Sequence, residues 1–389
     1  MRILITNNTL DERAGTELYV RDVAFALRAM GHEPVCFSMK LGEVAAELEA
    51  GGVRVVTDLA RAHGPFDVIH GHHRIETTLA AMAYPQVPVI SFCHGPKIWP
   101  ESPCTMPSVV QYVAVDEACR ERLITEGVAE ERIVRLLNFV DLSRFPPRRP
   151  LPVKPRKALV FSNNADVGGH LSVIEETCGR FEVTVEVIGR ASGKVSADPG
   201  TLMAEYDVVF AKARAAIEAM AVGCAVIQCD YFGVGWLVTS EKFDALRPLN
   251  FGYQSMDQPL TVEHLSSQMA AYDAADAAVV SARIRAEASL DQFVPQLLDV
   301  YERALGVSVP AFDPWEAAAD FLKEQMEQAK EAQHRLPLME VHLEDARRKV
   351  STLREKAAGL KTKNERLKEQ LSKQQKQGRK AWWKRSFLR

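Results

Sequence analysis

The sequence has neither a long apolar run nor the apolar segment of a signal peptide. Its apolar start, residues 1–6, meets Asn7, Asn8 and Asp11 too soon for a secretory signal. Because no run of about 18 apolar residues occurs, the sequence predicts no transmembrane helix. These absences lead us to expect a cytoplasmic protein.

Paired cysteines are missing as well. The seven cysteines are scattered, their number is odd, and no two are spaced as Cys-x-x-Cys. A disulfide framework or a cysteine zinc site needs cysteines in pairs. The pattern therefore indicates reduced thiols in the protein core.

Acidic residues outnumber basic residues only slightly, which gives a net charge of −3. The charges are nevertheless unevenly distributed: residues 347–389 contain 16 Lys and Arg but only 3 Asp and Glu. An acidic body therefore precedes a strongly basic tail. Such an asymmetry concerns the partners of a protein rather than its fold.

Strand-like and helix-like segments alternate along residues 1–148. Short apolar runs predict strands at residues 2–7, 34–38, 53–57, 66–70, 87–92 and 110–115. Apolar residues at helical spacing predict helices between them, at residues 17–30, 76–84 and 117–126. Asp116 is the expected N-cap of the last helix. Strands separated by helices are typical of βαβ units and a parallel sheet.

A proline-rich and basic segment, residues 146–157, interrupts this pattern and is interpreted as an interdomain linker. A second alternation follows, with strands predicted at residues 158–161, 183–188, 207–210 and 225–229, and helices at 171–179, 213–221 and 262–273. We therefore expect an α/β protein with two Rossmann-like domains, residues 1–148 and 158–307. The ligand cleft is expected between them, near the carboxyl ends of the strands.

The chain after residue 314 has another pattern. Apolar residues, with Asn364 as the polar exception, recur every seven positions in two series: Leu336, Leu343, Val350, Ala357, Asn364, Leu371 and Met339, Ala346, Leu353, Leu360, Leu367. This heptad repeat predicts an α-helical coiled coil over residues 314–377, and Asn364 at an a position favours a parallel homodimer. The alternatives are one long amphipathic helix packed on the rest of the chain and a basic solvated helix.

Residues 378–389 differ again, because five basic residues surround Trp382, Trp383, Phe387 and Leu388. Aromatic rings flanked by cations favour peripheral contact with an anionic membrane. A disordered end and a protein-docking peptide are the open alternatives, whereas nucleic-acid binding is not expected because no fold of that kind accompanies the tail. We expect the protein on the inner face of the membrane.

Histidines follow two neighbouring strand-like runs. His70, His72 and His73 come at the end of one run, and His94 ends the next. Their spacing suits no common zinc ligand set, so no metal site is predicted. At the carboxyl ends of strands, these histidines are expected to face the cleft. Gly15, just before the first helix, would leave backbone N–H groups open to phosphate, although turn geometry alone can also explain it.

Residues 112–145 resemble glycosyltransferase family 4, whose members are retaining enzymes of the GT-B fold. Asn138, Asp141 and Phe145 fall on the family's "NGVD…F" pattern. Other segments of the family are matched in the same order and spacing by the turn "AGTE" at residues 14–17, the stretch "DVIHGH" at residues 67–72, and His94.

The resemblance implies donor binding by the second half of the chain and acceptor binding mainly by the first. It places Gly15 near the donor phosphates and His94 near the donor sugar. The stretch "IEAMAVGCAVI" at residues 217–227 resembles the family's "lEAmA.G.PVI". Glu218 would therefore take the ribose hydroxyls, for which a bidentate acceptor is well suited.

The second half also departs from the family pattern. Phe210 stands where the family has the first Glu of a Glu-x7-Glu pair, and residues 162–169 (SNNADVGG) replace its Arg and Lys. Cations are needed to stabilise a departing diphosphate. Lys212 and Arg214 are therefore predicted to supply that charge, with ordinary surface charge as the alternative.

Three further glycines are predicted to contact the donor. Gly168 and Gly169 would admit phosphate to the backbone, and Gly233 lies in a glycine-rich stretch, residues 230–235, that follows a predicted strand. The resemblance places a glycine-rich loop at this last position.

The resemblance thus implies a retaining, metal-independent glycosyltransferase that moves a sugar from a nucleotide-sugar to a glycan or lipid-linked acceptor, in cell-surface polysaccharide synthesis. No cofactor is expected beyond the donor substrate. The alternative is a catalytically degenerate GT-B protein that binds a nucleotide-sugar or glycan, or acts as a coiled-coil scaffold. A sugar epimerase or phosphorylase of the same fold is a third possibility, although no pyridoxal lysine for a phosphorylase is identified.

Overall fold

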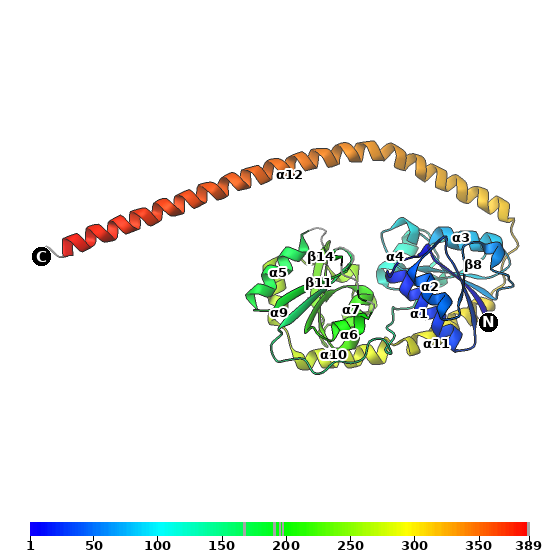
Figure 1. Cartoon of the computed structure of the whole chain (residues 1–389). Coiled ribbons are helices and arrows are strands. Elements are labelled where there is room, and N and C mark those ends of the chain that lie inside the picture. Colours follow the sequence, from blue (N-terminus) through cyan, green and yellow to red (C-terminus); the bar gives the residue numbers. More distant parts are fainter. Residues whose placement is uncertain (166–168, 190–191, 194–195, 197, 387–389) are drawn as a thin grey trace. The chain divides into compact units, whose positions relative to one another are not determined.

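The computed structural model of the chain describes residues 1–165, 169–189, 192, 193, 196 and 198–386. Its contacts divide the chain into two units, Met1–Pro314 and Trp315–Arg389. The first unit contains two α/β domains and the second is helical (Figure 1).

A parallel seven-stranded sheet forms the centre of the first domain, in the order β5-β3-β1-β6-β7-β8-β9. Its strands are β1 (Arg2–Thr6), β3 (Glu33–Phe37), β5 (Arg54–Val56), β6 (Val68–His72), β7 (Val89–Cys93), β8 (Val109–Ala114) and β9 (Ile133–Arg135). The helices are α1 (Gly15–Ala29), α2 (Glu43–Ala50), α3 (Arg74–Ala83) and α4 (Glu117–Thr125). Two short strands, β2 (Thr9–Leu10) and β4 (Lys40–Leu41), pair beside it. The expected N-cap of α4 is confirmed, because the Asp116 carboxylate accepts from Cys119 N at 2.8 Å.

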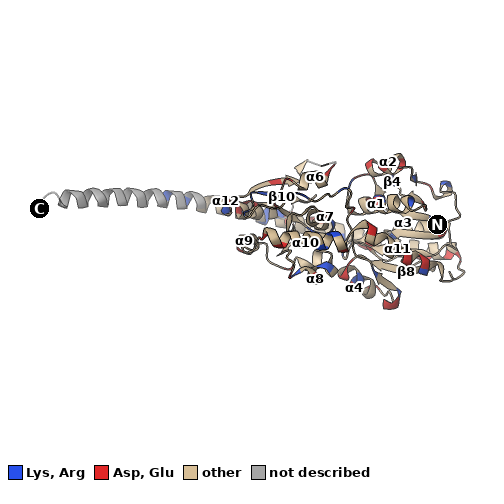
Figure 2. Ribbon diagram, turned by 90° about the horizontal axis from the view of Figure 1, so that it is seen from below, with Lys and Arg blue, Asp and Glu red and all other residues tan. Residues whose placement is uncertain are grey.

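The second domain has a five-stranded sheet in the order β11-β10-β12-β13-β14. Its strands are β10 (Lys157–Phe161), β11 (Thr184–Ile188), β12 (Val208–Ala211), β13 (Ala225–Asp230) and β14 (Gly233–Leu237). Its helices are α5 (His170–Arg180), α6 (Pro199–Met203), α7 (Ala213–Val222), α8 (Phe243–Leu246), α9 (Val262–Ala270) and α10 (Ala274–Glu287). Acidic and basic residues are interspersed over the helices of both domains (Figure 2). The predicted architecture, two Rossmann-like domains with parallel sheets, is confirmed.

Strand β14 corrects one prediction. Residues 230–235 were predicted to form a glycine-rich loop at the donor, but Gly233 begins β14, which pairs antiparallel with β13. A Cβ atom at Gly233 would lie 2.5 Å from the carbonyl oxygen of Met256. This glycine therefore permits close backbone packing.

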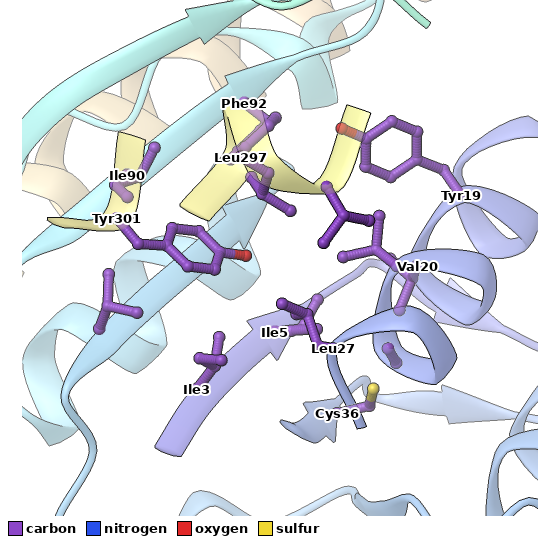
Figure 3. Packing of buried hydrophobic residues seen from close by; sticks show 14 of the residues in the cluster. Ile3, Ile5, Tyr19, Val20, Leu27, Cys36, Ile90, Phe92, Leu297 and Tyr301 are labelled. Atoms are coloured by element: carbon purple, nitrogen blue, oxygen red, sulfur yellow. The ribbon is translucent and has the colours of Figure 1, made fainter. Parts of the chain in front are cut away.

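Helix α11 (Leu290–Leu305) corrects the predicted boundary of the second domain, which ran to residue 307. Its residues Phe293, Leu297 and Tyr301 lie on one helical face and are buried in the core of the first domain. Figure 3 shows Leu297 and Tyr301 among Ile3 and Ile5 of β1 and residues of α1 and β7. The chain thus returns to the first domain after completing the second, and α11 is part of the first domain.

The second unit is the single helix α12 (Pro314–Ser386), which continues through Pro337. The heptad residues Leu336, Leu343, Val350, Leu353 and Leu360 are between 48% and 67% exposed in this single chain. Within the described ranges, no helix combines the length and the apolar character needed to span a membrane. The side chains of Asn364 and of residues 378–386, and the whole of residues 387–389, lie outside the described residues.

Candidate functional site

A cavity of about 280 Å³ lies between the two domains of the first unit. The first domain contributes the N-terminus of α1, with Arg13, Ala14, Gly15 and Leu18. The second contributes residues at the carboxyl ends of β10, β11, β12 and β13, together with the first turn of α7. Ligands of open parallel sheets bind at this end of the strands.

The cavity brings together four residues predicted from the sequence, Gly15, Lys212, Arg214 and Glu218. Gly15 is the first residue of α1, and a Cβ atom placed there would meet nothing within 4 Å. The space beside the N-terminal N–H groups of α1 is therefore open, as an anion site requires.

The other predicted glycines lie elsewhere. Gly169 caps α5 with a φ of 72°, a left-handed conformation that glycine adopts readily, but it does not line the cavity. Gly233 also lies outside the lining. Gly168 falls outside the described residues.

Arg214 is held by carboxylates from both domains. Its Nε donates to Glu218 Oε1 at 2.8 Å, one turn further along α7, and its Nη2 pairs with Asp22 of α1. The side chains of Arg214 and Asp22 are 12% and 2% exposed. Burial lowers the pKa of Arg214, but the two carboxylates outweigh it and the pKa is raised overall. Arg214 therefore links the domains, a role that the sequence did not predict.

Asp22 is the centre of a larger charge network. Besides Arg214, its carboxylate contacts Arg21 at 2.6 Å and Arg144 at 3.7 Å. Arg21 in turn lies 3.1 Å from Glu47 of α2. The network connects α1, α2 and α7, so that domain closure and the position of Arg214 depend on one another.

Glu218 is buried at the wall of the cavity, with 7% of its side chain exposed. Burial raises the pKa of Glu218 above its usual value, and the neighbouring Arg214 guanidinium acts in the opposite direction. Arg214 therefore both orients this carboxylate and favours its ionised form.

Lys212 immediately precedes α7 and lines the same cavity. Its ammonium pairs with the buried carboxylate of Asp230 at the end of β13, and its side chain is 36% exposed. The next residue, Ala213, has a φ of 48°, which is unusual for a residue with a Cβ atom. Such strained backbone clusters at functional sites.

None of the predicted histidines lines the cavity, and His70, His72 and His73, which were expected to face the cleft, are buried. His70 was expected to face the cleft, but β6 extends to His72 and places His70 inside the core. There its Nδ1 lies 2.5 Å from the Tyr301 hydroxyl, and its ring stacks on Phe92. The run of apolar residues ends at His70, whereas the strand continues for two more residues.

His94 follows β7 directly and is half-buried. Its Nε2 lies 2.7 Å from His72 Nδ1, and its backbone N–H donates to Glu101 at 2.8 Å. Burial lowers the pKa of His94 to about 4, so the ring is neutral at pH 7. Among residues with described placement, no three His, Cys, Asp or Glu side chains form a group suited to a metal ion.

Acidification is expected to destabilise the chain through His94. An unfolded histidine has a pKa of about 6.5, whereas that of His94 in the folded chain is about 4. Between these values the unfolded chain binds a proton that the folded chain does not, so stability falls as the pH falls. Urea unfolding at about pH 7 and about pH 5 should show a lower midpoint at the lower pH. In His94→Gln this decrease should be smaller; an unchanged decrease would contradict the assignment.

Three carboxylates that position site residues were not predicted from the sequence. Asp22 pairs with Arg214, Glu101 accepts from the backbone of His94, and Asp230 pairs with Lys212. Glu218 and Arg214 are four residues apart, so their pairing on one helix face follows from helix geometry. No such spacing connects Asp22 to Arg214, because the two lie in different domains.

Residues 52–144 match the family model described as Glycosyltransferase Family 4, which confirms the resemblance of the first domain. No curated protein matches the sequence. Among solved structures, HepE from Anabaena in complex with UDP aligns with a TM-score of 0.59 at 14% identity, over 78% of this chain and all of that one (100%). The lipopolysaccharide outer core galactosyltransferase WaaB aligns with a TM-score of 0.52 at 14% identity, over 78% of this chain and 100% of that one. These likenesses show that the fold is GT-B.

Proposed function

From the GT-B fold and the family match in its first domain, we propose that the chain is a retaining, metal-independent glycosyltransferase. It transfers a sugar from a nucleotide-sugar to a glycan or lipid-linked acceptor. The supporting observation is the interdomain cavity, where the open N-terminus of α1 meets Glu218 and Lys212. HepE, whose fold is similar, has been solved with UDP-glucose.

In this proposal Glu218 binds the ribose of the donor. Its carboxylate accepts hydrogen bonds from the two vicinal hydroxyls, while Arg214 fixes its orientation at 2.8 Å. Arg214 is therefore a positioning residue rather than the phosphate ligand that the sequence predicted, because both of its partners are carboxylates.

The donor diphosphate lies between the N-terminus of α1, at Gly15, and the Lys212 ammonium. The helix N-terminus supplies N–H donors and a partial positive charge. When the donor binds, the Lys212 ammonium leaves Asp230 and pairs with the diphosphate. There it stabilises the negative charge that develops on the diphosphate as its bond to the sugar breaks.

His94 contacts the donor sugar as a neutral ring. The Nε2 atom of His94 is hydrogen-bonded to His72, so its Nδ1 is the nitrogen that hydrogen-bonds a sugar hydroxyl. The Glu101 carboxylate holds the backbone of His94, which fixes the ring at the end of β7.

The role of Glu218 is tested by nucleotide release from UDP-, GDP-, ADP- and TDP-sugars. With the effective donor, Glu218→Ala is expected to raise KM about 10²-fold, because charged hydrogen bonds contribute about 1.5–3 kcal/mol each. Glu176→Ala is the matched control, since Glu176 also pairs with an arginine four residues away but is 60% exposed. Equal kinetics in the two variants would refute the role of Glu218.

A catalytically degenerate protein is the second candidate, and the absence of the family's Glu at Phe210 favours it. Phe210 is buried in the core of the second domain, so it takes no part in donor binding. A chain that binds a nucleotide-sugar without releasing the nucleotide in the presence of any glycan acceptor would support this candidate.

For the second unit we propose a parallel homodimer through the heptads of α12, with residues 378–389 in peripheral contact with the inner membrane surface. The exposed heptad residues support the dimer, because a partner helix would bury them. Sedimentation of the full chain and of a chain ending at Leu371 tests both parts. The full chain should be a dimer, and only the full chain should bind anionic liposomes.

A further inference from the structure

Three aromatic side chains of the second domain form an exposed group beside the cavity. Tyr231 and Phe232 follow β13, and Tyr253 begins the short helix η6 (Tyr253–Ser255). The Phe232 ring lies 4.9 Å from the Tyr231 ring and 4.9 Å from the Tyr253 ring, between centroids. The three residues, which we call the aromatic shelf, are between 37% and 39% exposed.

A lysine lies over a ring at each side of the aromatic shelf. Lys212 Nζ is 4.3 Å from the centroid of Phe232, and Lys212 also lines the cavity. Lys97, three residues after His94, belongs to the first domain and lies 3.6 Å from the centroid of Tyr253. The shelf therefore borders the cavity, and each domain supplies one of the two lysines beside it.

The position of Tyr253 is fixed by a second contact between the domains. The Gln254 side-chain amide donates to Glu121 of α4 at 2.6 Å. The rings are thus exposed although their backbone is anchored, and exposed aromatic groups of this kind on a soluble protein mark binding surfaces.

The two lysines differ in their counter-ions. Lys212 pairs with Asp230, whereas Lys97 has no carboxylate within ion-pair distance among the described residues. An anionic group on a ligand would therefore meet an unneutralised cation at Lys97, next to the rings.

The chemistry of the aromatic shelf selects a sugar. The face of an aromatic ring carries negative charge density, and one face of a pyranose presents polarised C–H groups that stack on it. Stacking also leaves the sugar hydroxyls at the ring edges free for water or for transfer.

We propose that the aromatic shelf binds a sugar ring of the acceptor and that Lys97 pairs with a negatively charged group on the same acceptor. The proposal rests on the proposed function, which it deepens by naming the acceptor class: a glycan with an anionic oxygen close to the accepting sugar. A uronic acid or a phosphate linked to the sugar would supply that oxygen.

Retention of the full chain on immobilised oligosaccharides tests the proposal, with neutral, uronate-bearing and phosphate-bearing sets. Anionic glycans should be retained more strongly than neutral ones, and the set retained identifies the source of the charge. Phe232→Ala and Tyr253→Ala should each weaken retention about tenfold. Lys97→Gln should reduce the retention of anionic glycans to that of neutral glycans. The retention of anionic glycans should then no longer depend on the salt concentration.

Trp315→Ala is the matched control, because Trp315 is 81% exposed but lies in the second unit. The proposal is overturned if the wild-type chain retains no glycan, or if the shelf variants and Lys97→Gln retain glycans as Trp315→Ala does. Calorimetric titration of the same samples with UDP-, GDP-, ADP- and TDP-sugars separates the two hypotheses. Glycan retention without donor binding would reject the proposed function but support the aromatic shelf as a glycan site. Donor binding without glycan retention would support the proposed function and reject the role of the shelf.

Discussion

Lys212→Ala is expected to lower kcat about 10²–10³-fold, the loss that follows removal of one group that stabilises transition-state charge. Lys212 is the lysine of the cavity lining, and Arg214 is already engaged by Asp22 and Glu218. Arg13, which also lines the cavity, pairs with Glu43 and Glu47, so the diphosphate would lose the side-chain cation that the proposal assigns to it. Nucleotide release at saturating donor measures the effect.

Two further variants separate this charge effect from a loss of structure. Lys212→Ala leaves the buried Asp230 without its ion-pair partner, which destabilises the chain. The double variant Lys212→Ala, Asp230→Asn should recover stability but remain inactive. Lys242→Ala should retain wild-type turnover, since Lys242 also lies over an aromatic ring, 5.5 Å from the centroid of Trp236, but outside the cavity. Turnover in the double variant close to wild type would exclude Lys212 from the reaction.

Asp22→Ala is expected to cost about 3 kcal/mol of unfolding free energy, because it removes one of the two carboxylates that each of two buried guanidinium groups contacts, while Arg21 keeps Glu47 and Arg214 keeps Glu218. The Arg21 and Arg214 side chains are 4% and 12% exposed, and Asp22 contacts both. Urea unfolding measures the loss. Small-angle X-ray scattering should also show a larger radius of gyration in the native variant, because Asp22 links α1 to α7.

The matched control for Asp22 is Asp299→Ala. Asp299 pairs with Arg303 at 2.7 Å on α11, but the side chains are 64% and 54% exposed. Exposed pairs contribute about 0–1 kcal/mol. If Asp22→Ala is as stable as Asp299→Ala and as compact as the wild type, the interdomain network does not hold the domains together.

The sequence predicted the alternation of strands and helices because each element carries its own apolar period. It could not predict the place of α11. The apolar face formed by Phe293, Leu297 and Tyr301 would suit any core, and only the three-dimensional arrangement shows that the first domain receives it. The same holds for Asp22 and Arg214, whose pairing depends on domain closure.

Among the site residues, Glu218 and Gly15 were predicted from local patterns and do line one cavity. His70 shows the limit of such patterns. Its apolar run ends two residues before the strand does, so a histidine expected at the strand end lies in the core. Gly233 similarly belongs to a strand, since glycine content alone does not distinguish a loop from closely packed backbone.

Calorimetric titration of the full chain with UDP-, GDP-, ADP- and TDP-sugars tests the central claim most directly, because it asks whether the interdomain cavity is a nucleotide-sugar site. We predict binding of at least one donor, with affinity reduced about 10²-fold in Glu218→Ala and unchanged in Glu176→Ala. Binding of none of these donors, or equal binding by Glu218→Ala and the wild-type chain, would contradict the account.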